Sequence, residues 1–164
     1  MDQDVLLTFA EVGIAIAGFT GIVVTLGKRA QGQWEDKDRY RLRDLLFASL
    51  GAGIFGFLPI VLTGANMSDA VALQYSAAVM VLYIVVGIMA FLRGATGKIG
   101  AYSLALAVPT ILIVAMLVLV GANIIYRVAT FAYYLALFWL VLLSMANFAR
   151  LLMADHAEES EPSD

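Results

Sequence analysis

The sequence predicts an all-α polytopic membrane protein with five transmembrane helices, on the basis of its composition and its long apolar runs. Of its 164 residues, 62% are hydrophobic and only 14% are charged, whereas soluble domains are about one quarter charged. A helix that crosses the roughly 30 Å hydrocarbon core needs about 20 apolar residues. The predicted spans are residues 5–26, 45–64, 70–92, 101–120 and 129–152.

These spans make residues 1–154 a single transmembrane helical domain. Residues 155–164 are acidic and lack large apolar side chains. Such a segment cannot bury enough surface to become ordered, so we expect a disordered tail. The chain begins with Asp2 and Asp4 rather than the basic residues of a cleaved signal peptide, so the first apolar run is expected to be a retained helix.

The basic residues predict the orientation of the chain. Nine of the ten Lys and Arg residues fall in the first connection, the third connection or the end of the last span, which share one side in a five-span chain. Only Arg127 falls on the other side. Because Lys and Arg accumulate on the cytoplasmic side, we expect the N-terminus outside and the C-terminus in the cytoplasm of a multi-pass cell-membrane protein. In a prokaryote this membrane would be the inner membrane.

The first connection is the largest polar segment. Residues 34–44 lack Gly and Pro, so we expect them to extend the second helix into the cytoplasm. Their basic side chains point to lipid or partner binding. Interleaved acids cancel much of this charge and favour a purely topogenic role instead: they are Glu35, Asp36, Asp38 and Asp44.

The second span divides into a small-residue face and a large-residue face. Small residues allow the close backbone approach that helix association in lipid requires, so we expect this face to pack on protein. It comprises Ala48, Ser49, Ala52, Gly53, Gly56, Pro59 and Thr63. Pro59 has no N–H group, so we expect the freed carbonyl near Phe55 to accept a hydrogen bond from a Ser or Thr hydroxyl or to face a polar cavity.

The first span contains a comparable set of small residues and one acid. Gly13, Ala17 and Gly21 follow each other at four-residue intervals, and Gly18 widens the same arc. Glu11 is in line with Gly18 at the edge of this arc. We therefore expect its carboxyl group to point into an interhelical cleft rather than at lipid.

Glu11 lies about 9 Å inside the first span at 1.5 Å per residue. Intramembrane acids are functional by default, which predicts an ion or proton site. Two structural alternatives remain: a protonated acid that hydrogen-bonds between helices, and an interfacial acid that reaches the outer water. Gln74 and Tyr75 fall at a matching depth and complete the candidate polar site. Tyr133 and Tyr134 are expected in an aromatic belt at the outer interface.

The residue inventory argues against an enzyme. The chain has no cysteine and one histidine, His156 in the tail, which excludes thiolate sites and a histidine-based triad within the spans. It contains no phosphate-binding loop, HExxH or GxSxG motif. We expect no cofactor, no metal and no nucleic-acid partner.

Two functions from different classes remain. The first is a homo-oligomeric ion channel or proton-conducting protein in which Glu11 lines the path. The second is a non-conducting membrane subunit or scaffold that binds partner membrane proteins. A wet axial passage that reaches Glu11 would favour the first function, and a dry, filled core would favour the second.

Overall fold

The computed structural model is a bundle of five α-helices and contains no strand in the residues that it describes, which are 1–26, 36–94, 101–122 and 128–159. The helices are α1 (Gln3–Leu26), α2 (Asp36–Gly64), α3 (Asp69–Gly94), α4 (Ala101–Gly121) and α5 (Ala129–Glu159). The all-helical prediction is confirmed, and each helix coincides with one predicted apolar run.

Four of the helices are long and apolar enough to cross a membrane. They contain the apolar stretches Gln3–Thr25, Arg39–Gly64, Asp69–Ala90 and Ala129–Met153. The fourth helix contributes the shorter apolar stretch Ala107–Gly121. This composition is compatible with a multi-pass membrane protein.

Two helices extend well beyond their predicted spans. Helix α2 begins at Asp36, before its apolar run, as the absence of Gly and Pro from residues 34–44 predicts; Lys28, Arg29 and Trp34 lie outside the described residues. Helix α5 continues through Glu159, so it includes residues 155–159, the first half of the segment that we expect to be a disordered tail. The Ala and Glu residues of this segment are good helix formers, which explains the continuation beyond the apolar run.

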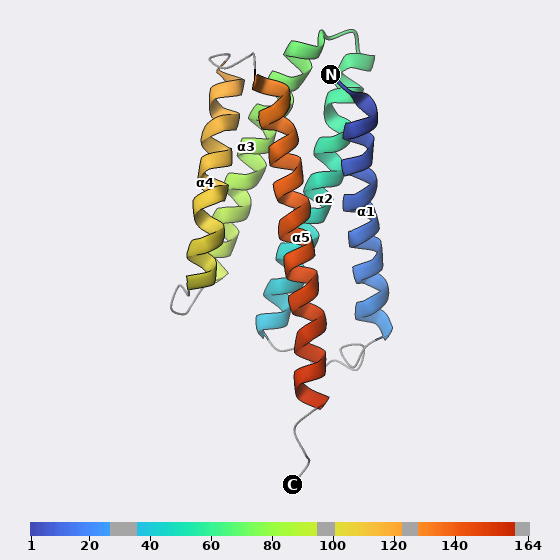
Figure 1. Cartoon of the computed structure of the whole chain (residues 1–164), viewed down its shortest axis with the longest axis vertical. Coiled ribbons are helices and arrows are strands. Elements are labelled where there is room, and N and C mark those ends of the chain that lie inside the picture. Colours follow the sequence, from blue (N-terminus) through green and yellow to red (C-terminus); the bar gives the residue numbers. More distant parts are fainter. Residues whose placement is uncertain (27–35, 95–100, 123–127, 160–164) are drawn as a thin grey trace.

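Successive helices run in opposite directions along the bundle (Figure 1). The N-terminus, the α2–α3 turn and the start of α5 lie at one end, called here the N-terminal end. The start of α2 and the C-terminal part of α5 lie at the other end. We call this the basic end, because Arg39, Arg41, Arg43 and Arg150 lie there.

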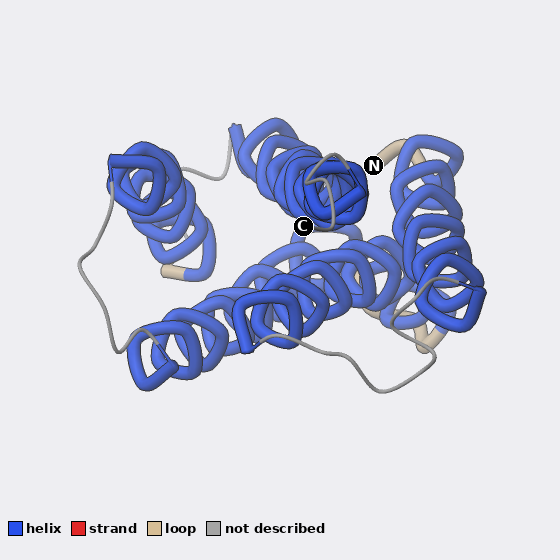
Figure 2. The backbone as a smooth tube through the Cα atoms, turned by 90° about the horizontal axis from the view of Figure 1, so that it is seen from below, coloured by secondary structure: helices blue, strands red, loops and turns tan. Residues whose placement is uncertain are grey.

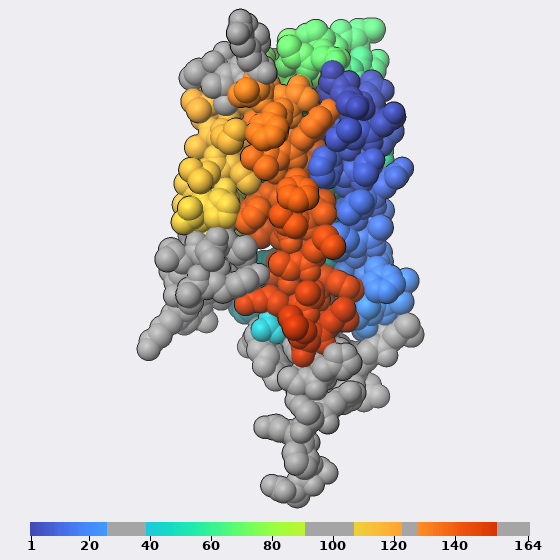
Figure 3. All heavy atoms as spheres, in the orientation of Figure 1, coloured from blue at the N-terminus to red at the C-terminus, as the bar shows by residue number. Residues whose placement is uncertain are grey.

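Helices α2 and α5 occupy the centre of the bundle. Helix α2 packs against α1, α3 and α5, and α5 packs against all four other helices. A view along the bundle shows α1 and α4 well separated from each other (Figure 2). On the face drawn in Figure 3, α5 fills the space between them.

The interior between these helices is filled with apolar and aromatic side chains. The largest fully buried side chains include Tyr133, Phe55, Met80, Leu117 and Leu137, which come from four different helices. These side chains form one continuous cluster. The centre of the described bundle is therefore packed and apolar rather than a water-filled passage.

Helices α1 and α2 are in direct backbone contact. A Cβ atom added to Gly13 would lie 2.5 Å from the carbonyl oxygen of Ser49, and one added to Gly56 would lie 2.7 Å from that of Leu6. Real side chains do not approach this closely, so both positions require glycine for this packing. On α2, the small residues Ser49, Ala52, Gly53 and Gly56 are buried, whereas the large residues Leu50, Ile54, Phe57 and Val61 are exposed.

Two further glycines let aromatic rings join α2 to α3. The ring of Tyr83 lies against Gly51, and the ring of Phe47 lies against Gly87. The two rings stack with their centroids 4.0 Å apart and their planes 10° apart. The Tyr83 hydroxyl also donates a hydrogen bond to the carbonyl of Phe47 at 2.7 Å, so this contact has both apolar and polar components.

Pro59 lies inside α2 and leaves the carbonyl of Phe55 without its usual helical donor. The Tyr133 hydroxyl on α5 donates to this carbonyl at 2.8 Å, and both residues are almost completely buried. The expectation that Tyr133 belongs to an interfacial aromatic belt is therefore wrong. Because the carbonyl of Phe55 is buried away from water, it needs a donor from the protein. The Tyr133 hydroxyl supplies this donor in place of the N–H group that Pro59 lacks.

This arrangement predicts a specific coupling between Tyr133 and Pro59. Tyr133→Phe leaves the buried carbonyl of Phe55 without a donor and should lower the free energy of unfolding in detergent by about 1 to 3 kcal/mol. In a Pro59→Ala background, the restored N–H group can bond to this carbonyl, so the same substitution should have a much smaller effect. Chemical denaturation of the four variants measures this difference. An equal loss in both backgrounds would show that the hydroxyl does not replace the missing donor.

Candidate functional site

Glu11 lies on the outer surface of α1. Its side chain is exposed, and it makes no hydrogen bond or ion pair with any described residue. The buried face of the same helix carries Leu6, Ala10 and Gly13, which pack against α2. Glu11 is therefore directed away from the interior of the chain, and the expectation that its carboxyl group points into an interhelical cleft is wrong.

Small and polar residues share this surface with large apolar ones. We define the α1 outer stripe as Thr8, Glu11, Ala15, Gly18 and Thr25, all of which are exposed. The side chains of Val12, Ile14 and Ile22 are exposed beside them. A Cβ atom added to Gly18 would meet nothing within 4 Å, and the same holds for Gly21 on the flank of the stripe. These two glycines therefore leave open space along α1, in contrast to the filled space at Gly13 and Gly56.

Two faces of α1 carry small residues, and the rotation of α1 about its own axis depends on which of them packs against α2. Small residues occur around most of the helix, so their spacing alone does not say which of them meet α2. Gly13 fits against Ser49 and Gly53, and Ala10 fits against Gly56. This match turns Ala17 to a half-buried position and leaves Gly18, Gly21 and Glu11 on the exposed side.

Gln74 and Tyr75 do not join Glu11 in a polar cluster. Both lie near the start of α3, where Tyr75 is exposed and Gln74 is half-buried. Helix α3 packs mainly against α2, α4 and α5. No hydrogen bond links either residue to Glu11 in the described part of the chain.

The next residue, Ser76, is a polar position that sequence reasoning did not single out. It is fully buried, and its Oγ atom has no hydrogen-bond partner among the described residues. The buried polar groups near Phe55 thus serve packing between α2, α3 and α5.

Polar contacts also tie the N-terminal end together. The amino group of Met1 pairs with Asp69 Oδ2 on α3 at 3.0 Å. The Tyr134 hydroxyl accepts a hydrogen bond from the Asp2 N–H group at 2.9 Å and donates one to the Asp2 carbonyl at 3.0 Å. These contacts hold the start of α1 against α3 and α5, and they leave Glu11 uninvolved.

A side-chain hydrogen bond links α4 to α5. Trp139 Nε1 donates to Thr110 Oγ1 at 3.0 Å. Both side chains are half-buried. This bond, one residue after Pro109 within α4, connects α4 to the centre of the bundle, and nothing in its geometry marks a reactive group.

The described residues show no constellation for catalysis or metal binding. No group of three or more His, Cys, Asp or Glu side chains among them could hold a metal ion. The carboxyl group of Glu11 makes no hydrogen bond or ion pair with a basic side chain or a nucleophile in the described part of the chain. The site can offer a hydrogen-bonding or ionic contact, next to a surface that another helix can approach closely.

Comparison with protein-family models, with curated protein sequences and with solved structures finds no match for this chain.

The exposure of Glu11 predicts that its side chain contributes nothing to the stability of the isolated chain. Glu11→Gln and Glu11→Leu should leave the melting temperature of the purified protein in detergent unchanged, because no described contact is lost. Gly56→Leu is the matched control and should lower it, because the new side chain would collide with the α1 backbone. A clear loss of stability in Glu11→Leu would instead indicate a buried partner for the carboxyl group.

Proposed function

We propose that this chain is a five-span membrane subunit, with its N-terminus outside, that binds a partner membrane protein through the α1 outer stripe. The observation that carries the proposal is the exposure of Glu11, beside the small residues Ala15 and Gly18, on a helix that is long enough to span the membrane.

The number of spans depends on α4. This helix has 21 residues, which corresponds to about 32 Å at 1.5 Å per residue and is enough to cross the hydrocarbon core. It runs alongside α3 and α5 over its length (Figure 1). Helix α4 therefore counts as the fourth of five spans.

The distribution of charge supports the orientation. Arg39, Arg41 and Arg43 lie at the start of α2, and Arg150 lies near the end of α5 at the same end of the bundle. Because basic residues accumulate on the cytoplasmic side, the basic end is cytoplasmic and the N-terminal end is outside. Glu11 then lies in the outer half of the membrane.

Reporter fusions test this topology. Fusions after Ala65, Gly97, Asn123 and Asp155 should report outside, inside, outside and inside, respectively, because each successive span reverses the side. A cytoplasmic signal at Asn123 together with an outside signal at Ala65 would show that α4 does not cross the membrane.

A lipid-exposed α1 outer stripe would be unfavourable for two reasons. An ionised carboxylate at the centre of a bilayer costs about 2.5 to 3.5 kcal/mol on insertion scales, and less towards the interface. Gly18, Gly21 and Ala15 offer lipid little side-chain surface but let another backbone approach closely. A second transmembrane helix on this stripe would satisfy the carboxyl group and fill the open space.

The charge of Glu11 favours a different protein over a second copy of this chain. In a second copy with the same orientation, a symmetric contact would place one Glu11 against the other. The Lys and Arg residues that the structure describes lie at the opposite end of the bundle, so in such a symmetric contact none of them lies opposite Glu11. We therefore infer a partner helix that presents a basic or amide side chain opposite Glu11. The filled core likewise favours a subunit over a channel through the protomer.

A photo-reactive side chain at Ala15 tests the contact in native membranes. We expect an adduct with a second membrane protein, and we expect the crosslinked peptide of that protein to be a transmembrane segment with a basic or amide residue. Glu11→Leu should reduce the adduct about fivefold, because an intramembrane polar contact is worth about 1 kcal/mol. The same photo-reactive group at Leu82, which is 64% exposed on α3, is the control and should not give this adduct.

Two outcomes would contradict the subunit proposal. An adduct of two copies of this chain would make the α1 outer stripe a homo-oligomeric contact. Proton or potassium flux through vesicles that contain only this protein, lost in Glu11→Gln, would support the ion-conducting alternative. In that case the ion path would lie between copies, where Glu11 is exposed.

A further inference from the structure

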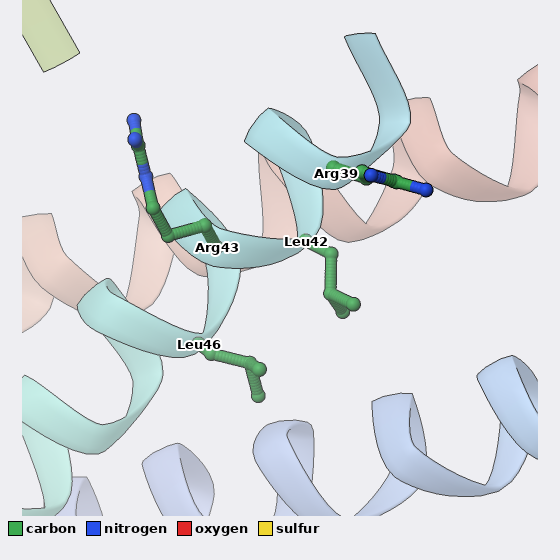
Figure 4. Close-up of a pocket in the computed structure, with 4 residues that line it drawn as sticks. All are labelled: Arg39, Leu42, Arg43 and Leu46. Atoms are coloured by element: carbon green, nitrogen blue, oxygen red, sulfur yellow. The ribbon is translucent and has the colours of Figure 1, made fainter. Parts of the chain in front are cut away.

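An open groove of about 520 Å³ lies at the basic end of the bundle, along the first turns of α2. It is lined by Arg39, Leu42, Arg43 and Leu46. The two leucine side chains project together from α2 towards α1, whereas the two arginine side chains extend away from each other near the start of the helix (Figure 4). The groove therefore has a cationic border and an apolar floor.

The two arginines differ in how far their charges are already neutralised. Arg43 donates from Nε and Nη2 to Asp44 Oδ1 at 3.1 and 2.9 Å, and its guanidinium group lies 5.2 Å from the centre of the Tyr40 ring. Arg39 is exposed and makes no hydrogen bond or ion pair with the described residues. Arg39 is thus the cation at this groove that is available to a ligand.

The order of these residues along α2 matches the order of groups in a phospholipid. Arg39 lies nearest the start of the helix, and Leu46 lies about 10 Å deeper at 1.5 Å per residue. A guanidinium group binds phosphate oxygens through two parallel hydrogen bonds. Leucine side chains provide the apolar contact that an acyl chain needs.

We propose that this groove binds an anionic phospholipid of the cytoplasmic leaflet, with its phosphate on Arg39 and one acyl chain over Leu42 and Leu46. Basic pockets at the cytoplasmic ends of transmembrane helices are suited to such headgroups. This inference rests on the membrane topology proposed above but not on the contact at Glu11. An acidic protein segment would also be attracted to Arg39, but it would leave the leucine floor without an acyl chain.

Lipid binding to the purified protein tests the proposal. The protein is titrated in detergent with phosphatidylglycerol or with phosphatidylcholine of identical acyl chains, and bound lipid is counted by native mass spectrometry. We expect tighter binding of phosphatidylglycerol. Arg39→Gln should weaken that binding about fivefold, the effect of one basic residue near anionic lipid.

The matched control is Arg41→Gln, which makes the same change of charge on the same helix but does not line the groove. It should leave the affinity for phosphatidylglycerol unchanged. Leu46→Gln should weaken binding of both lipids, because it makes the floor of the groove polar.

Three results would overturn the proposal. These are equal affinity for the two lipids, equal losses in Arg39→Gln and Arg41→Gln, and binding of soluble glycerol phosphate as tight as that of phosphatidylglycerol. Resistance of the protein to alkaline extraction from membranes, measured in parallel, separates this failure from a failure of the membrane topology. Loss of the lipid preference in a protein that stays membrane-embedded contradicts the lipid site alone.

Discussion

The direct backbone contact between α1 and α2 determines how the rest of the chain is arranged. At Gly13 and Gly56 the two helices leave no room for even a methyl group, since a Cβ atom there would come within 3 Å of the opposing backbone. This contact fixes the rotation of α1 about its own axis. Once the face with Leu6, Ala10 and Gly13 is turned inward, Glu11 and Gly18 must face outward. The exposed acid is thus a consequence of packing elsewhere on the same helix.

Helix α2 can lie in the dry centre of the bundle because its buried backbone carbonyl at Phe55 has a hydrogen-bond donor there. Pro59 removes one helical donor, and Tyr133 of α5 replaces it. On another side of α2, the Phe47 ring lies against Gly87 of α3 and the Tyr83 ring of α3 lies against Gly51. The two rings stack and form the contact between α2 and α3. The contacts of α2 with α1 and with α3 both use glycines on one helix to admit the backbone or a ring of the other. Such packing explains how a chain with few internal polar groups holds its helices in register.

The sequence was sufficient to predict the helices. It also predicted which face of α2 is buried, because small and large residues separate cleanly around the axis of α2. It was not sufficient for α1, where small residues occur on both sides and the positions of Ser49 and Gly53 decide which side is buried. The Tyr133 bond was also missed. Pro59 indicated a carbonyl without its helical donor, and Pro59 and Tyr133 lie about one turn from the same end of the bundle. Sequence alone could not show that α5 contacts α2 there.

The central claim is that another helix covers the α1 outer stripe in the native membrane. Because the chain has no cysteine, a single spin label can be placed at Ala15→Cys, with Leu82→Cys on α3 as the lipid-exposed reference. In particles extracted directly from native membranes, we predict that dissolved oxygen, which concentrates in lipid, relaxes the label at residue 15 much less than the label at residue 82. Equal oxygen accessibility at the two positions would show that the stripe faces lipid and would contradict the claim.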